Sequence, residues 1–165
     1  MRLEEKDLSF DETILYLSKP LPLIGTFYQN EHSILQNLLF SGLVKTALLT
    51  ADFLYLKSVK PENLSDAKML AIAELDDYTT FTNEQEAAPL HNLVTKIELI
   101  LKLIIAPLLQ KDGGNIKLET YADGIIYVHF LGKCQGCPYA KHTLKNHVEK
   151  NLLRYLPQTK EVVLV

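Results

Sequence analysis

This sequence of 165 residues has few cysteines, no excess of positive charge and no long apolar run. Its only two cysteines, Cys134 and Cys137, are too close together to link distant parts of a secreted fold, which favours a reducing compartment. The formal net charge is -3, so the chain as a whole lacks the basic footprint that phosphate groups require. Nucleic acid is therefore not expected as a partner.

Neither a membrane span nor a targeting segment is expected. The longest apolar run, residues 99–109, is interrupted by Lys102 and Pro107 and is about half of the roughly 20 residues that a span needs. Residues 1–17 mix charges and lack a continuous apolar core, which argues against a signal peptide or a mitochondrial presequence. We expect a soluble protein without a membrane partner, cytoplasmic in a bacterium or located in the mitochondrial matrix if the host is eukaryotic.

The apolar content of 47% is enough for a packed core, and the length allows one medium domain or two small ones. The first half predicts a small β-α-β-β-α unit over residues 1–79. Its elements are a strand at residues 12–19, a helix that Ser33 caps and Gly42 ends, two strands around a turn at residues 50–52, and a helix over residues 61–78. The polar, acidic stretch at residues 80–89 is predicted to be a linker.

Residues 90–165 predict a compact α-β-β-α-β unit, so the fold class is α/β (α+β) with two small domains. The pattern contains a helix that Pro107 should kink or break, with a residual turn to Gln110 as the alternative. It also contains a hairpin with its turn at "ADG" (122–124), a helix from Pro138, and a closing strand "EVVLV". In the second strand of the hairpin, Ile126, Val128 and Phe130 are expected to share one face.

The two cysteines form a CxxC motif in the loop between the hairpin and the following helix. Gly132 and Gly136 allow the backbone to turn tightly there, and Pro138 suits the first position of a helix. The partial positive charge of a helix N-terminus is expected to favour the thiolate, which is the form that attacks disulfides and binds metals.

Several kinds of site use this motif. A thioredoxin-like fold needs more chain than the 28 residues that follow Cys137. A structural zinc site needs four ligands, and His142 and His147 are five residues apart, which is about 140° of rotation on an α-helix. His129, His142 and His147 are each expected to be solvated or interface residues. Iron–sulfur clusters are usually held by four cysteine thiolates, which two chains around a twofold axis would supply.

The segments "PLLQKDGGNIKL" (107–118) and "DGIIYVHFLGKCQGCPYAKHTLKNHVEKNLLRYLP" (123–157), followed by "EVVLV", resemble the NifU C-terminal domain. That family has P-x-L-x-x-D-G-G, a hairpin, G-x-C-x-G-C-P and then T-L-K. Asn115 and His147 stand where aspartate and glycine are common. The first half, with "ETILYL", "SILQNLLF" and "ADFLYLK", resembles a diverged form of the domain that precedes it in Nfu-type proteins, although Ile34 replaces a usual proline.

The resemblance implies an iron–sulfur cluster assembly scaffold or carrier and not an enzyme. Its cofactor-binding and metal-binding residues would be Cys134 and Cys137, which would hold a labile [4Fe–4S] cluster between two chains. The expected partners are apo-proteins that receive the cluster, upstream assembly proteins, and a second copy in a cluster-bound homodimer. The alternative is a thiol-redox or zinc-binding protein that uses the same CxxC motif.

Residues around the motif have structural alternatives. Residues 112–114 ("DGG") are expected to form the turn after the first helix of this unit, and the alternative is that they shape the surroundings of the cluster. Thr143 and Lys145 are expected on a solvated helix face, with a contact to the recipient as the alternative. Tyr139 would either shield the cluster or pack against the protein.

Overall fold

The structure is a computed structural model that describes residues 3–77 and 90–165. The chain divides into two compact units, residues 1–88 and 89–165, with the α+β architecture expected from the sequence. The segment predicted to be a linker, residues 80–89, lies outside the described residues. Among those described, no helix is long and apolar enough to cross a membrane.

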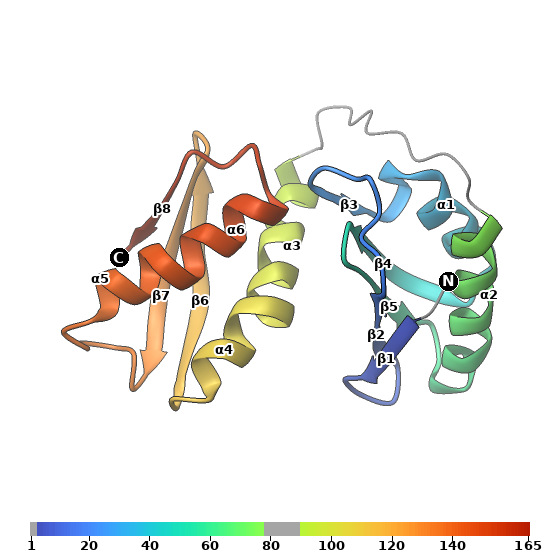
Figure 1. The fold of residues 1–165 in the computed structure, drawn as a ribbon, viewed down its shortest axis with the longest axis horizontal. Helices are drawn as coiled ribbons and strands as arrows, with labels where there is room; N and C mark the ends of the chain where they lie inside the picture. Colours follow the sequence, from blue (N-terminus) through green and yellow to red (C-terminus); the bar gives the residue numbers. More distant parts are fainter. Residues whose placement is uncertain (1–2, 78–89) are drawn as a thin grey trace. The chain divides into compact units, whose positions relative to one another are not determined.

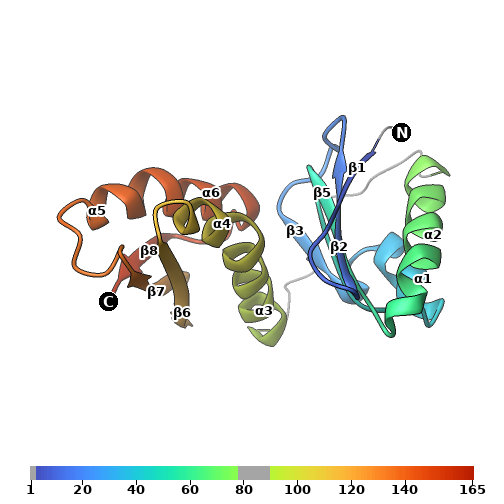
Figure 2. The ribbon, with the colours of Figure 1, turned by 90° about the horizontal axis from the view of Figure 1, so that it is seen from below.

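The N-terminal unit is an antiparallel sheet of five strands with helices on one face (Figures 1 and 2). The strand order is β1-β2-β5-β4-β3. The helices α1 and α2 bury an apolar core against that face, which includes Leu15, Leu38 and Leu54. The elements are β1 (Leu3–Asp7), β2 (Glu12–Leu17), β3 (Thr26–Tyr28), α1 (Ser33–Phe40), β4 (Val44–Thr50), β5 (Phe53–Ser58) and α2 (Leu64–Asp77).

Two of these strands, β1 and β3, were not predicted. Strand β1 has the sequence LEEKD and lies at the edge of the sheet, so it lacks the apolar alternation of a half-buried strand. Its acidic residues Glu5 and Asp7 instead pair with Lys68 of α2, at 3.0 and 2.6 Å. Strand β3 has only three residues, too few for a periodic pattern.

The start of α1 also differs from the prediction. His32, and not Ser33, is the N-cap residue, and its Nδ1 accepts a hydrogen bond from the Ile34 amide at 3.3 Å. Ser33 is the first residue of the helix itself. Gly42 follows the end of the helix with a φ of 72°, a conformation that glycine adopts without strain.

The C-terminal unit packs its helices on one face of a three-stranded sheet (Figures 1 and 2). Strand β7 (Ile125–Gly132) pairs with β6 (Gly114–Ala122) in antiparallel and with β8 (Glu161–Leu164) in parallel orientation. The hairpin turn is at Asp123 and Gly124, and both have positive φ, as in a type I′ turn. On β7 the alternation is as predicted, with the buried side chains Ile126, Val128 and Phe130.

Pro107 does not break the first helix of this unit. The run consists of α3 (Leu90–Ile100), the π-helical segment η3 (Leu101–Ile105) and α4 (Ala106–Gln110). Proline lacks the N–H that an α-helix would use at this position, and its ring clashes with the carbonyl of the preceding turn. The π-helical segment just before it, in which the Ala106 amide donates to the Leu101 carbonyl, changes the hydrogen-bond register at that point.

The second helical run begins at Ala140, two residues later than the sequence predicted. It consists of α5 (Ala140–Thr143), the π-helical segment η4 (Leu144–Glu149) and α6 (Lys150–Tyr155). Val148 and Leu152 are fully buried against the sheet.

The burial of Leu152 predicts a loss of stability on truncation. Leu152→Ala removes a side chain that is 0% exposed, so we expect the free energy of unfolding of the C-terminal unit to fall by about 2–5 kcal/mol. Hydrogen exchange of the β7 amides measures this free energy. Leu108→Ala is the control, because Leu108 is 40% exposed, and equal losses for the two variants would contradict the proposed packing.

Candidate functional site

The loop that carries the cysteines connects β7 to α5 by three turns of backbone hydrogen bonding. The Gln135 amide donates to the Gly132 carbonyl at 3.1 Å, the Cys137 amide to the Cys134 carbonyl at 3.4 Å, and the Ala140 amide to the Cys137 carbonyl at 3.0 Å. Both cysteines are free thiols and half-buried. The loop therefore holds the two sulfur-bearing residues on one short, hydrogen-bonded segment at the end of a strand.

The "DGG" turn lies directly beside this loop. Gly114 pairs with Gly132 in the β6–β7 ladder, and the Lys133 amide donates to the Gly113 carbonyl at 3.2 Å. A Cβ atom on Gly114 would overlap the Cys134 Sγ, and one on Gly132 would lie 2.6 Å from the Gly113 carbonyl oxygen. The turn after α4 thus also shapes the surroundings of Cys134, because only glycine leaves room for the thiol.

The electrostatic environment of Cys134 differs from the expectation. Burial, and then the nearby Cys137 and Asp112, raise the pKa of the Cys134 thiol. The expectation that the helix N-terminus favours the thiolate is therefore wrong for this residue. The helix begins only at Ala140, six residues after Cys134, and the effect of a helix dipole falls off within the first turn.

The histidines near the motif do not complete a metal site with it. His129 Nε2 lies 3.2 Å from a carboxylate oxygen of Glu119, while His142 and His147 are exposed on the helical run. The rotation of about 140° between His142 and His147 holds for an α-helix, whereas the chain between them is largely π-helical. Even so, residues 3–77 and 90–165 contain no group of three or more His, Cys, Asp or Glu side chains placed to hold a metal.

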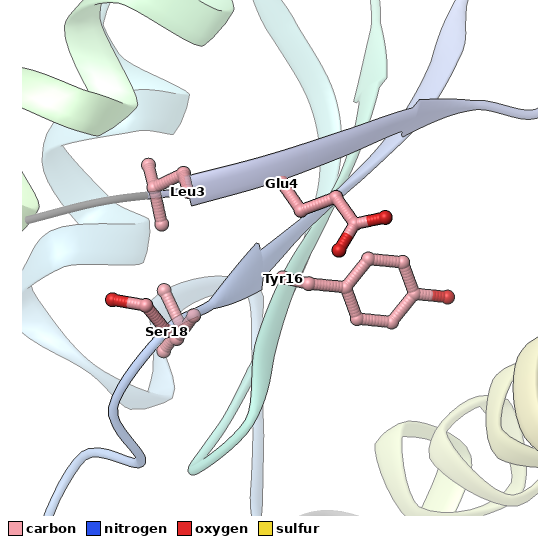
Figure 3. A pocket seen from close by; sticks show the side chains of 5 residues that line it. Leu3, Glu4, Tyr16 and Ser18 are labelled. Carbon is pink, nitrogen blue, oxygen red and sulfur yellow. The ribbon is translucent and has the colours of Figure 1, made fainter.

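An open groove lies elsewhere, at the β1–β2 edge of the N-terminal sheet (Figure 3). Its volume is about 460 Å³, and Figure 3 shows the Glu4 carboxylate beside the Tyr16 ring. The groove contains no cysteine and no converging set of polar groups, so it is not the candidate site. Its lining residues are Leu3, Glu4, Tyr16, Leu17 and Ser18.

Fold and site together define the C-terminal unit as a small α+β domain that presents a CxxC loop bordered by a "DGG" turn. Residues 97–163 match the family described as "NifU-like domain". Residues 97–163 are thus similar to the NifU-like domain, which confirms the resemblance seen in the sequence. The N-terminal unit lies outside this match, so its likeness to the preceding Nfu domain stays a prediction.

Curated proteins similar to this chain carry names from iron–sulfur biology. The human "NFU1 iron-sulfur cluster scaffold homolog, mitochondrial" is 34% identical over 70 residues, which are 42% of this chain and 28% of that protein. The "Fe/S biogenesis protein NfuA" of Shewanella piezotolerans is 44% identical over 66 residues, which are 39% of this chain and 34% of that protein. The chain therefore covers about a quarter to a third of the length of these relatives.

The contact between Gly114 and Cys134 predicts a local effect of a single methyl group. Gly114→Ala should displace the Cys134 side chain, because the added Cβ overlaps its sulfur. With ¹³Cβ-labelled cysteine, the NMR signal of Cys134 should shift more than that of Cys137. Lys117→Ala is the control on the same strand, since Lys117 is exposed. A Cys134 signal that does not move in Gly114→Ala would contradict the contact.

The raised pKa of Cys134 predicts slow alkylation of this thiol near neutral pH, because the thiolate is the reactive form. Asp112→Asn removes a negative charge that opposes the thiolate, so it should lower the pKa of Cys134 and speed its alkylation at a fixed, mildly alkaline pH. Labelling with iodoacetamide, read by peptide mass spectrometry, measures the rate. Asp123→Asn, in the turn at the other end of the hairpin, should leave the alkylation rate of Cys134 unchanged. Equal rates in the unaltered protein and both variants would show that Asp112 does not raise the pKa of Cys134.

Proposed function

We propose that this chain is an iron–sulfur cluster scaffold or carrier, which holds a labile [4Fe–4S] cluster between two copies of itself and transfers it to apo-proteins. The observation that carries the proposal is the ligand set of the NifU-like domain. It presents two free, half-buried thiols on one loop, and the described residues provide no third ligand near them. The names of the similar proteins support the same role.

The number of thiols determines the assembly. A cluster of this kind is usually held by four thiolates, and one chain supplies Cys134 and Cys137 only. A twofold axis brings the same loop of a second chain to the other side of the cluster. The homodimer is therefore the state that completes the site, and the cluster is the cargo of the protein.

The loop provides room for such a cargo. Gly136 faces open space, with no atom within 4 Å of the position of a Cβ, and Gly114 leaves the Cys134 sulfur free of a side chain on the neighbouring strand. Tyr139, which directly follows the motif and Pro138, is 74% exposed, so it does not pack against its own domain. The two sulfurs therefore lie at a surface where a second chain can approach.

Transfer would be a ligand exchange without oxidation or reduction. Thiols of the recipient lose their protons as their sulfurs bind the cluster iron atoms, and the Cys134 and Cys137 thiolates that leave take up protons. The raised pKa of Cys134 favours this release, because the freed sulfur is more stable as a thiol than as a thiolate. No general acid or base is required, so the proposed protein is a carrier and not an enzyme.

Recipients are apo iron–sulfur proteins, and upstream assembly proteins supply the cluster. The similar proteins include mitochondrial and bacterial examples, which agrees with either location expected from the sequence. The competing function is a thiol-redox or zinc-binding protein that uses the same two thiols. It predicts a monomer with a reversible disulfide or bound zinc in place of iron.

Anaerobic reconstitution with iron and sulfide tests the proposal. The chain should take up about two iron atoms per protomer, gain broad visible absorbance and become a dimer, since two chains share four irons. Cys134→Ala and Cys137→Ala should each abolish iron uptake, while Thr143→Ala on the next helix should retain it. A monomer without iron that forms an intramolecular disulfide, or full iron content in Cys134→Ala, would show that the assignment is wrong.

A further inference from the structure

We propose that the exposed face of the helical run after the cysteine loop is the docking surface for an acidic patch on the protein that receives the cluster. This inference rests on the proposed function and names the kind of recipient surface that the site fits. The surface, called here the basic helix face, consists of Lys141, His142, Lys145, His147 and Lys150. It begins four residues after Cys137, so a partner on it is next to the sulfurs.

The basic helix face has no negative charge among its exposed residues. From Pro138 to Lys150 the exposed residues are three lysines, two histidines, Pro138, Tyr139 and Asn146, and Glu149 is half-buried. The opposite side of the run carries Val148 and Leu152, which are packed against the sheet. The orientation of the helix is therefore fixed by its buried side, and the positive side is left to solvent or to a partner.

The lysines of this face have no ion-pair partner in the part of the chain that the structure describes. None of the ion pairs that the structure gives for the described residues uses Lys141, Lys145 or Lys150. Lys141 and Lys145 are four residues apart, a spacing at which like charges destabilise a helix. A negatively charged partner would offset this repulsion.

The π-helical segment contributes to this arrangement. In a π-helix the hydrogen bonds join residues five apart, so Lys145 near the start of η4 and Lys150, which directly follows η4, lie closer to one line along the axis. On an α-helix the same two residues would be rotated by about 140° from each other. The irregular helix thus gathers on one side charges that a regular helix would separate.

The net charge of the whole chain does not show that the C-terminal unit is basic. Residues 89–165 contain ten Lys and Arg against six Asp and Glu, a formal +4, whereas residues 1–88 contain seven against fourteen, a formal -7. The unit that carries the cysteines is thus basic although the protein is acidic. A basic surface around a transfer site attracts an acidic partner over several ångströms and raises its association rate, and salt weakens the effect.

Binding of a strongly acidic apo-ferredoxin to the apo form of the full chain tests the proposal. Lys145→Glu/Lys150→Glu should weaken binding by about tenfold at low ionic strength, and the difference should largely disappear at about 0.3 M salt. The matched control is Lys117→Glu/Lys160→Glu, which changes the charge of the same unit by the same amount at exposed positions outside the face. This control should remain within about twofold of the unaltered protein.

Equal weakening in the two double variants would overturn the proposal, because net charge alone would then explain binding. Loss of binding to a short DNA duplex, without any effect on the ferredoxin, would overturn it in favour of nucleic acid. In reconstituted protein, the transfer rate should follow the same order as the affinities. If no form takes up iron, the cluster-carrier function fails, and the binding measurement on apo-protein still decides whether the face docks an acidic partner.

Discussion

The candidate site depends on one backbone contact, the pairing of Gly114 with Gly132 at the end of the β6–β7 hairpin. This pair brings the turn after α4 against the loop that carries Cys134, and the Lys133 amide closes the contact through the Gly113 carbonyl. Side chains are excluded on both strands at this point, because a Cβ on either glycine would meet the thiol or a carbonyl oxygen. The position of the first sulfur is therefore determined by close packing of the main chain at the end of the sheet.

The rest of the site is defined by the metal ligands that the cysteine loop lacks. It presents two half-buried thiols and no histidine or carboxylate partner, so a four-ligand metal group can be completed only from outside the described part of the chain. Desolvation and the neighbouring Asp112 raise the pKa of Cys134, so this residue favours the protonated thiol when no metal is bound. A site with half of its ligands and a stable empty form suits a protein that gives up its cargo, and is poorly suited to permanent storage.

In the proposed carrier, the helical run after the loop is the element that contacts the recipient protein. Its apolar side is fixed by Val148 and Leu152, and its π-helical segment changes which side chains share the outer face. The two sides of this run therefore differ. The buried side packs within the domain, and the exposed side carries lysines that take part in none of the ion pairs given for the described residues. The net charge of the whole chain, -3, does not reveal the basic balance of residues 89–165.

Much of this unit followed from local sequence. The type I′ turn at Asp123 and Gly124, the alternation along β7 and the motif at Cys134 and Cys137 depend on neighbouring residues and on fixed periods, so the sequence alone determined them. It did not reveal the charged edge strand β1, the π-helical segments or the direction of the Cys134 pKa shift. These features depend on residues that are distant in the sequence and adjacent in the folded chain. The contact of Gly114 with Cys134 joins residues 20 positions apart, and only the tertiary structure brings them together.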